Sequence, residues 1–393
     1  MTATPTPHAS LPFSKALPWL LLITAVFFLN FITRIIFAPL MIAIEADLNL
    51  THIQAGRLFL DISVGYSLTL LFSGIVSCRV THRTTLAISS VIIGVMLLLL
   101  ANTTTLPATE LLLCGFGMGC GLYLGSGIAA LTSLVTPKDY GKAVAVHEIA
   151  PNVSFIVAPL LAEALLHIMS WRGVLACLGV TAIAIGIIYA RFGKGGDFKG
   201  EMPNFSLVGS ISRRREFWVL IAFFFLGLAV SFGPYSVLPL FLTGERGMTP
   251  EAANTLLAIS RLSGPVAVFG AGWLTDRLGP RLTLGLYLAL AAITTALLGL
   301  TSGATLLVVV VVQPLISVCF FPAGFALISE VFPAHVRNVA VSLIVPLAVL
   351  AGNGLVPTTL GYFGETSSFA HGFLALGIAT AAGLAGMPLL RRS

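Results

Sequence analysis

Twelve runs of about twenty predominantly apolar residues follow one another along this chain, separated by short polar segments. A helix of that length spans the hydrocarbon core of a bilayer, which is about 30 Å thick. Only 9% of the 393 residues are charged, whereas soluble globular proteins carry roughly 25%. The sequence therefore predicts an all-α integral membrane protein. We expect its transmembrane helices at 18–45, 53–77, 84–102, 108–135, 141–168, 172–192, 216–243, 250–275, 282–300, 303–330, 338–362 and 368–389.

The most polar stretch of the chain, between about Arg191 and Glu216, separates the first six runs from the last six. Most of the 21 Lys and Arg residues lie in this stretch, near the termini, or in loops on the same side of the membrane. Basic residues concentrate in cytoplasmic loops, so both termini and the linker are predicted to face the cytoplasm. We expect a tail at 1–17, a first six-helix half at 18–192, a linker at 193–215 and a second half at 216–393.

A charged hairpin joins the second and third apolar runs of each half. In the second half it reads Gly272-Trp273-Leu274-Thr275-Asp276-Arg277-Leu278-Gly279-Pro280-Arg281. The counterpart lies 198 residues earlier, at 74–83, with Cys78 in place of the acid and Thr81 in place of the second glycine. The same offset of 198 relates Pro159 to Pro357, Thr51 to Thr249, and Asp47 to Glu245. Several matches at one offset indicate that the two halves are homologous.

With this hairpin and two sets of six helices, the chain resembles the major facilitator superfamily over roughly residues 15–390. The resemblance implies a transporter that works as a monomer by alternating access, with its two halves rocking about a central site. It also implies a conformational latch on the cytoplasmic face, in which the hairpin engages the start of helix 11 or helix 5. The latch residues are Gly272, Asp276, Arg277, Gly279 and Arg281.

The chain departs from the pattern of that superfamily in three places. The first-half hairpin lacks the acid at Cys78, so its latch is expected to be weaker. Cys114 or Gly115 stands where many proton-driven members carry an arginine early in helix 4. The glycine cluster of drug/proton antiporters is missing around Pro159. These departures weigh against a multidrug antiporter.

Two arginines inside apolar runs are the main candidates for substrate binding. An ionised side chain at the centre of a bilayer costs about 2.5–3.5 kcal/mol on insertion scales, so it marks a function or a compensating partner. Arg34 lies near the middle of the first run and Arg261 near the middle of the eighth. Facing one cavity from opposite halves, they would bind a carboxylate, sulfonate or phosphonate. The alternative is an internal acid for each, and Asp61 is the candidate for Arg34.

Neutral polar residues inside the runs complete the predicted substrate site. Each is a weak signal alone, because amides in mid-helix usually bond to a neighbouring helix. They are Asn30, Tyr123, Asn152, Tyr235, Gln313 and Asn353.

Three titratable residues are candidates for proton coupling: Asp61, Glu148 and His147. Asp61 lies one turn after Arg57 and can pair with it or with Arg34, and it can take up a proton if it loses that partner. Glu148 begins a polar stripe on the fifth helix, with His147 as its modulator. The competing interpretation is that Glu148 forms a cytoplasmic salt bridge to Lys142 or Arg337.

The sequence thus predicts a secondary transporter of the cell inner membrane that moves a small organic anion, most simply together with a proton. The first alternative is a proton-coupled exporter of drugs or metabolites, with a large apolar cavity and both arginines internally paired. The second is a membrane sensor or scaffold that does not transport. No nucleophile elbow, metal pair or nucleotide motif occurs in the sequence, so we expect no enzyme activity and no cofactor. The expected partners are the anionic substrate, a proton and the lipid bilayer, with no nucleic acid.

Overall fold

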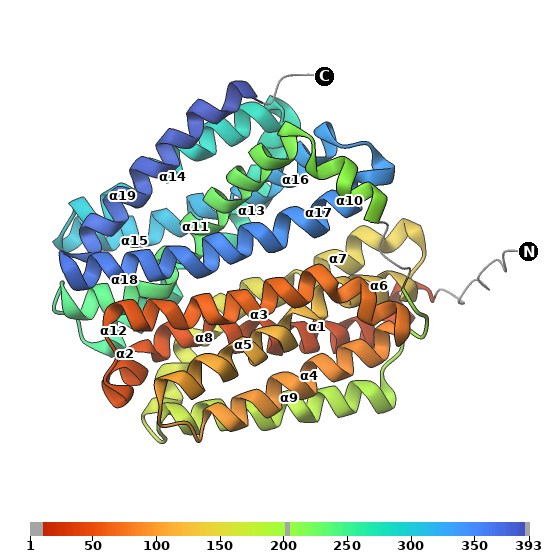
Figure 1. Cartoon of the computed structure of the whole chain (residues 1–393), viewed down its shortest axis with the longest axis horizontal. Coiled ribbons are helices and arrows are strands. Elements are labelled where there is room, and N and C mark those ends of the chain that lie inside the picture. The colour runs from red at the N-terminus through yellow and green to blue at the C-terminus, as the bar shows by residue number, and fades with distance from the viewer. Residues whose placement is uncertain (1–10, 201–204, 390–393) are drawn as a thin grey trace, which may run out of the picture.

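The computed structural model describes residues 11–200 and 205–389 (Figure 1). Within this part of the chain, 12 helical spans are long and apolar enough to cross a membrane. Their ends lie within a few residues of the predicted ones, so the predicted fold class is confirmed. The basic residues Arg391 and Arg392, which contributed to the orientation prediction, lie outside the described residues.

Six spans form the first half and six the second. The first half consists of α1 (Phe13–Ile35) with α2 (Phe37–Leu48), α3 (His52–Arg79), α4 (His82–Leu100), α5 (Leu106–Gly121) with α6 (Tyr123–Leu134), η1 (Pro137–Asp139) with α7 (Tyr140–His147) and α8 (Ile149–Leu166), and α9 (Trp171–Phe192). The second half consists of α11 (Arg215–Gly244), α12 (Pro250–Ser260) with α13 (Gly264–Leu278), α14 (Pro280–Leu300), α15 (Gly303–Ser317) with α16 (Phe320–Val331), α17 (Ala334–Val349) with η2 (Leu350–Leu355) and α18 (Val356–Thr366), and α19 (Phe369–Ala382) with η3 (Gly383–Leu389). The linker contains a short helix, α10 (Phe205–Ser212), which the sequence analysis did not predict.

The same capping chemistry recurs in both halves. Thr51 and Thr249 cap α3 and α12, and each side chain accepts a hydrogen bond from the backbone three residues later. Asp47 accepts hydrogen bonds from Trp171 and Arg172 at the start of α9. Its counterpart Glu245 accepts from Ser368 and the backbone N–H of Phe369 at the start of α19. The sequence repeat is therefore a structural repeat, carried by equivalent contacts.

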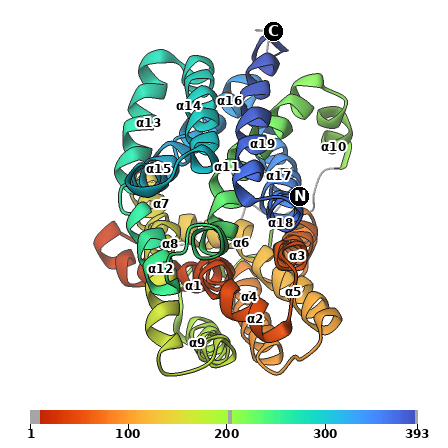
Figure 2. The same cartoon turned by 90° about the vertical axis from the view of Figure 1, so that its left-hand side faces the viewer.

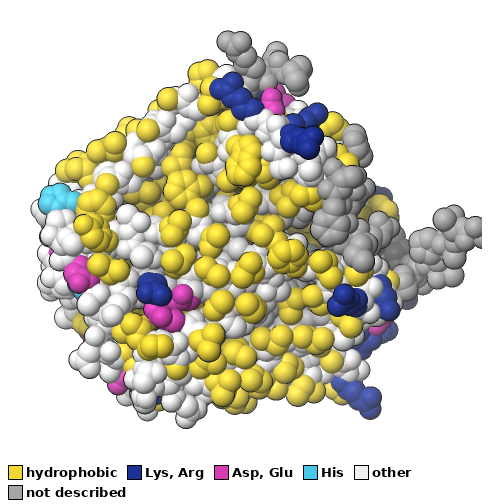
Figure 3. Space-filling view, in the orientation of Figure 1, with side chains coloured by type: hydrophobic (Ala, Val, Ile, Leu, Met, Phe, Trp, Pro, Cys, Tyr) yellow, Lys and Arg dark blue, Asp and Glu magenta, His cyan; other side chains and the backbone are white. Residues whose placement is uncertain are grey.

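The surface between the two ends of the bundle is apolar. In Figure 3 hydrophobic side chains cover a wide band, while most Lys and Arg side chains gather toward the right-hand side of the view. Large hydrophobic residues are highly exposed, among them Leu111 at 75%, Val266 at 76% and Phe269 at 80%. Exposed apolar surface of this extent is stable only against lipid.

The two halves lie one above the other in Figure 1 and meet along α3 and α18. The extensive contacts between them join α3 to α17, η2 and α18, α8 to α12, and α2 to α11. In the described part of the chain, none of these contacts involves α6, α7, α13 or α16. The view along the helices shows α3 beside α18 and α8 beside α12 as two separate seams (Figure 2).

Each seam carries one polar contact close to the predicted outer end. In the α3–α18 seam, the backbone N–H of Ile53 donates to Oε2 of Glu365 at 3.3 Å. In the α8–α12 seam, Nδ2 of Asn254 donates to Oε2 of Glu163 at 3.1 Å. The halves are therefore closed on each other at the end that the basic residues predict to face outward.

Candidate substrate and proton site

Proline breaks three of the spans where the candidate side chains lie. A proline removes the hydrogen bond to the carbonyl four residues earlier and its ring clashes with that carbonyl. Pro39 acts on the turn that follows Arg34, and α1 gives way to α2 at Ile36. Pro151 acts on His147, at the boundary of α7 and α8, and Pro265 acts on Arg261, between α12 and α13.

Arg34 lines a cavity of about 50 Å³ between the two halves. Its Nε donates to the carbonyl of Asn30 at 3.4 Å. Its guanidinium lies over the rings of Phe31 and Tyr66, at 4.9 and 4.6 Å from the ring centres. With two aromatic rings against its guanidinium, Arg34 offers its edge nitrogens to a partner.

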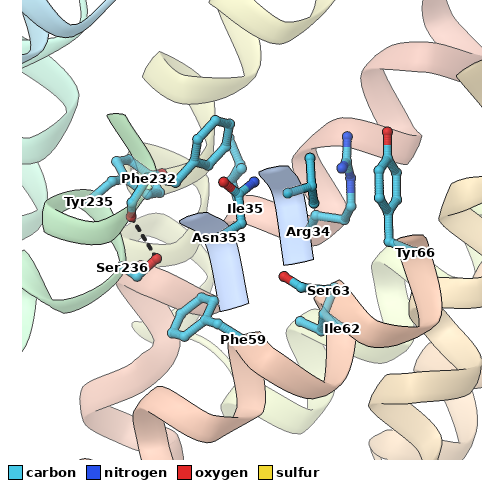
Figure 4. Close-up of a pocket in the computed structure, with 11 residues that line it drawn as sticks. Arg34, Ile35, Phe59, Ile62, Ser63, Tyr66, Phe232, Tyr235, Ser236 and Asn353 are labelled. Carbon is cyan, nitrogen blue, oxygen red and sulfur yellow. Dashed lines mark hydrogen bonds between the residues drawn. The ribbon is translucent and has the colours of Figure 1, made fainter. Parts of the chain in front are cut away.

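The remaining lining of this cavity comes from both halves and is mostly apolar (Figure 4). Asn353 of η2 projects between Arg34 and Ile35 on one side and Phe232 and Tyr235 on the other. The Oδ1 atom of Asn353 and the hydroxyl of Tyr235 are buried without a hydrogen-bond partner among the described residues. The other lining residues are Phe59, Ile62, Ser63, Tyr66, Ser236 and Val349.

Arg261 lines a second, smaller cavity of about 10 Å³ together with Asn152 and Phe155. The residue is only 5% exposed. Its Nη2 donates to the carbonyl of Ser231 at 3.2 Å, and its Nε is buried without a hydrogen-bond partner. The guanidinium lies over the rings of Phe155 and Tyr235, at 4.6 and 4.8 Å from their centres, and these two rings pack edge to face against each other. Tyr235 also lines the first cavity. Its side chain therefore lies next to both the Arg34 cavity and the guanidinium of Arg261.

Neither arginine is paired with an acid within the described residues, because no ion pair at 4.0 Å or less involves Arg34 or Arg261. Cation–π contacts contribute roughly 0.5–2 kcal/mol each. Burial of an unpaired cation costs several kcal/mol. The aromatic contacts therefore offset the cost only in part, and an anion at this place would remove most of it.

Asp61 is not the partner of Arg34 or Arg57. Arg57 pairs instead with Glu110 of α5, with Nε 3.1 Å from Oε1. Oδ2 of Asp61 is buried without a hydrogen-bond partner, and Asp61 is not among the residues that line the central cavities. Neither the Asp61–Arg57 nor the Asp61–Arg34 ion pair expected from the sequence forms. Arg57 instead pairs with Glu110, away from the central cavities.

His147 and Glu148 lie together at the break between α7 and α8. Nδ1 of His147 is 3.3 Å from Oε1 of Glu148. Nε2 of the same ring is 3.1 Å from the hydroxyl of Tyr123, and the ring stacks on Phe27 at 4.1 Å. Glu148 does not pair with Lys142, which binds Asp139 at 2.9 Å. It also does not pair with Arg337, whose Nη2 donates to the carbonyl of Ser329.

The other predicted substrate residues lie in different places. Asn152 lines the Arg261 cavity and donates to the carbonyl of Glu148 at 2.8 Å. Asn30 donates to the carbonyl of Cys120 at 3.1 Å, and Gln313 to the carbonyl of Val230 at 2.9 Å. Both are buried bonds between helices, and neither residue lines the two central cavities. Tyr123 is hydrogen-bonded to His147 and is likewise absent from both linings.

The hairpin of the second half makes contacts within that half. Nε of Arg281 lies 3.2 Å from Oε1 of Glu330 on α16. The guanidinium of Arg277 lies over the ring of Trp273 at 4.4 Å. Gly279 has φ of +81° at the turn into α14, a conformation that favours glycine. Gly272 lies within α13, with open space where a Cβ would stand. Asp276 forms no ion pair within the described residues.

Phe232 and Ser63 are site residues that the sequence analysis missed. A usable signal was the offset of 198, because it relates Arg34 to Phe232 and Arg261 to Ser63. The structure places these equivalents at the central cavity. Aromatic and small residues are common in apolar runs, so composition alone could not select them.

A family model described as Major Facilitator Superfamily matches residues 23–272 and 236–393. Among solved structures, a bacterial homologue of the human lysosomal transporter Spinster, inward-facing and occupied, is 17% identical, with 97% of each chain covered and a TM-score of 0.81. The nucleoside transporter NupG is 13% identical, with 95% of this chain and 98% of that chain covered and a TM-score of 0.78. A D-xylose–proton symporter is 15% identical, with 96% and 97% covered and a TM-score of 0.75. At these identities the structural likeness shows the fold.

Proposed function

Because the chain belongs to the Major Facilitator Superfamily, we propose that it is a secondary active transporter that moves a small organic anion across the inner membrane by alternating access, together with a proton. In this proposal Arg34 and Arg261 bind the anion, and Tyr235, Asn152 and Asn353 complete the site. Both termini and the linker at 193–215 face the cytoplasm, and the two halves at 18–192 and 216–393 move about the site.

The observation that carries the proposal is a pair of central arginines that form no ion pair with any acid among the described residues. They come from opposite halves, and each lies at a proline break, against aromatic rings. Each guanidinium has aromatic rings packed against it, so an incoming group approaches its edge, the geometry of bidentate carboxylate binding. The apolar lining around Phe59 and Phe232 favours an anion with an apolar body.

The small volume of the two cavities belongs to a closed arrangement of the site. About 50 Å³ is room for a few water molecules and not for an organic solute. Binding therefore requires the halves to separate around Arg34 and Arg261, as alternating access supplies. In such a cycle the substrate meets one arginine from each half, and its binding favours closure.

Proton symport suits a monovalent anion on physical grounds. A membrane potential of 100 mV, negative inside, opposes the entry of one negative charge by about 2.3 kcal/mol. An anion and a proton together cross as a neutral unit. The His147–Glu148 pair is our candidate for the proton site, because it lies in the same span as Asn152 and Phe155 of the Arg261 cavity. The peripheral Asp61 is the weaker candidate.

The exporter alternative requires both arginines to be paired internally. Among the described residues neither Arg34 nor Arg261 forms an ion pair with an acid. The geometry therefore favours an anion over a lipophilic cation or a neutral drug as the substrate.

Ligand-induced thermal stabilisation of the purified protein tests the proposal. A ligand that binds only the folded state raises the transition temperature by mass action. The panel contains small carboxylates, sulfonates, phosphonates and neutral drugs, and each hit is repeated with Arg261→Ala. The matched control is Arg246→Ala, because Arg246 also lies over an aromatic ring, Phe241, but outside the site.

We expect a carboxylate to stabilise the wild type and the Arg246→Ala control but not Arg261→Ala. Stabilisation by lipophilic cations or neutral compounds alone would refute the anion proposal. A carboxylate shift that survives in Arg261→Ala would refute the role of this arginine.

A further inference from the structure

A chain of three polar groups crosses from the junction of α7 and α8 to α1 inside the first half. It begins at Glu148, whose side chain is 52% exposed, and passes to His147, which is completely buried. Nε2 of His147 is 3.1 Å from the hydroxyl of Tyr123, and this hydroxyl is 3.1 Å from the carbonyl of Ile23. Gly127 makes room for the tyrosine, since a Cβ there would lie 2.6 Å from its ring.

The end of this chain determines the direction of every hydrogen bond in it. The carbonyl of Ile23 can only accept, and the hydroxyl of Tyr123 has a single hydrogen to donate. The arrangement that satisfies both contacts has Tyr123 donating to Ile23 and Nε2–H of His147 donating to Tyr123. A neutral imidazole with hydrogen on Nε2 has none on Nδ1. Nδ1 then faces a carboxylate oxygen of Glu148, and two acceptors at 3.3 Å repel each other unless a proton lies between them.

We propose that Tyr123 fixes the tautomer of His147, and that His147 and Glu148 therefore hold one shared proton, which is the proton that accompanies the anion. This inference rests on the proposed function and deepens it. Tyr123 acts as a positioning residue and does not contact the substrate. The proton is held either as imidazolium with carboxylate or as imidazole with carboxylic acid, so the loaded pair is neutral.

Few other charged or titratable groups face this pair. Tyr123 faces His147 from α6, and Tyr189 of α9 lies near Tyr123 and donates to the carbonyl of Gly195. On α1 the neighbouring residues are Ile23 and Phe27, which carry no charge. Within the described residues the partner of His147 for a shared proton is thus Glu148.

The pair is connected to the arginines by packed rings. Phe27 stacks on His147, and Phe31 lies one turn further along α1, at 6.0 Å from Phe27. Phe31 contacts both Arg34 and Phe155, and Phe155 contacts Arg261. When the proton leaves to water from the half-exposed Glu148, its carboxylate and Nδ1 of His147 repel each other. The ring stack then transmits the displacement to α1, which carries Arg34.

The test reads the tautomer directly and needs no substrate. The protein is labelled with ¹⁵N-histidine in lipid vesicles and studied by solid-state NMR. The protein has seven histidines, and His147 is identified by the signal lost in His147→Gln. In the wild type we expect imidazolium and the Nε2–H form of His147, with no Nδ1–H form at any pH. In Tyr123→Phe we expect the Nδ1–H form to appear, because Nε2 has lost its acceptor.

The control is Tyr189→Phe, which removes the hydroxyl of another buried tyrosine in the same half. We expect it to leave the His147 signals unchanged. An Nδ1–H form in the wild type, or unchanged His147 signals in Tyr123→Phe, would overturn the positioning role.

If Tyr123→Phe does not fold, Glu148→Gln provides a second measurement. The glutamine amide can donate to Nδ1 and needs no proton, so the imidazolium form of His147 that the wild type shows should be replaced by the neutral Nε2–H form at the same pH. An unchanged imidazolium signal in Glu148→Gln would contradict a shared proton. These results do not depend on which anion binds. Failure of the proton pair is therefore distinguishable from failure of the anion panel.

Discussion

The two halves of the molecule share one scaffold and differ in the chemistry that they bring to its centre. In the first half, Arg34 and the His147–Glu148 pair lie at proline breaks. In the second half Arg261 lies at such a break, and the positions equivalent to His147 and Glu148 are Val345 and Pro346. The second half therefore has a buried cation at its break and no titratable pair at the positions equivalent to His147 and Glu148.

This difference assigns the proposed anion binding to both halves and the proposed proton coupling to the first half. Both halves contribute an arginine, so an anion between them draws the halves together. The equivalents of the arginines, Phe232 and Ser63, are uncharged and line the same cavity. Each half thus offers one cation and one neutral residue at related positions. In the proposed function the anion is therefore contacted from both halves, while the proton site belongs to the first half alone.

The largest expected effect comes from Arg261→Lys. Arg261 is almost fully buried and lies over two rings, where a lysine cannot offer the same fork. A lysine keeps the charge but loses the second hydrogen bond of the fork. A hydrogen bond to a charged group contributes about 1.5–3 kcal/mol, and burial places this loss toward the upper end, so affinity for the stabilising carboxylate should fall about 100-fold. Titration of the thermal shift measures it. Arg246→Lys is the control, and an Arg261→Lys variant that binds as well as the wild type would contradict a bidentate contact.

A smaller loss is expected for Arg34→Lys. Arg34 is less buried than Arg261, and its Nε already has the carbonyl of Asn30 as acceptor. A hydrogen bond to a charged group contributes about 1.5–3 kcal/mol, so the affinity should fall roughly 10–100-fold. The same titration compares the two variants. If Arg34→Lys were the more damaging, the first half would be the principal binding element and our ranking of the halves would be wrong.

The next largest effect is expected for Pro265, the proline at the helix break beside Arg261. Pro265→Ala restores a donor to the carbonyl of Arg261, which favours a continuous helix through the break. We expect the transition temperature to rise by a few degrees and transport of the carboxylate into proteoliposomes to slow several-fold.

Pro250→Ala is the matched control for Pro265→Ala. Pro250 is in the first turn of α12, where a missing N–H has no cost. A variant at Pro265 that transports at the wild-type rate would show that the break is not needed to place the guanidinium.

Sequence reasoning was strongest where the physics is local. Apolar length determined the spans, and the offset of 198 related the halves, because both depend only on the order of residues. Sequence reasoning was weaker for predicting ion pairs. Asp61 was assigned to Arg57 of the same helix or to Arg34 of the preceding helix, whereas the partner of Arg57 is Glu110 on another span.

The helix breaks show the same limit. The prolines were visible in the sequence, but which side chains they expose depends on the packing of several spans. Asn30 and Gln313 looked like cavity residues and prove to be buried bonds to the carbonyls of Cys120 and Val230. A polar residue in an apolar run can either line a cavity or form a hydrogen bond to a neighbouring helix. The sequence does not distinguish the two, because the choice depends on which residues of other helices lie beside it.

The smallest expected effect concerns the two seams at the predicted outer end. Each has one carboxylate that crosses between the halves, Glu163 from the first and Glu365 from the second. A histidine lies near each seam. Nε2 of His167 is 3.3 Å from Oε1 of Glu163, and Nδ1 of His52 is 2.6 Å from Oε1 of Glu45. A net hydrogen bond of this kind contributes about 1 kcal/mol. Glu163→Ala and Glu365→Ala should therefore each shift the balance toward the outward-open state by about five-fold.

Spin labels at the predicted outer ends of α8 and α12 would report this shift as a second, longer distance in pulsed electron resonance. We expect the two single variants to be similar and the double variant to be additive, because the seams are separate in space. Glu216→Ala is a control, since this residue lies at the other end of the bundle, at the start of α11. A shift in only one of the two single variants would show that the halves differ in closure as well as in proton binding. The two halves would then differ in chemistry at their outer ends as well as at the central site.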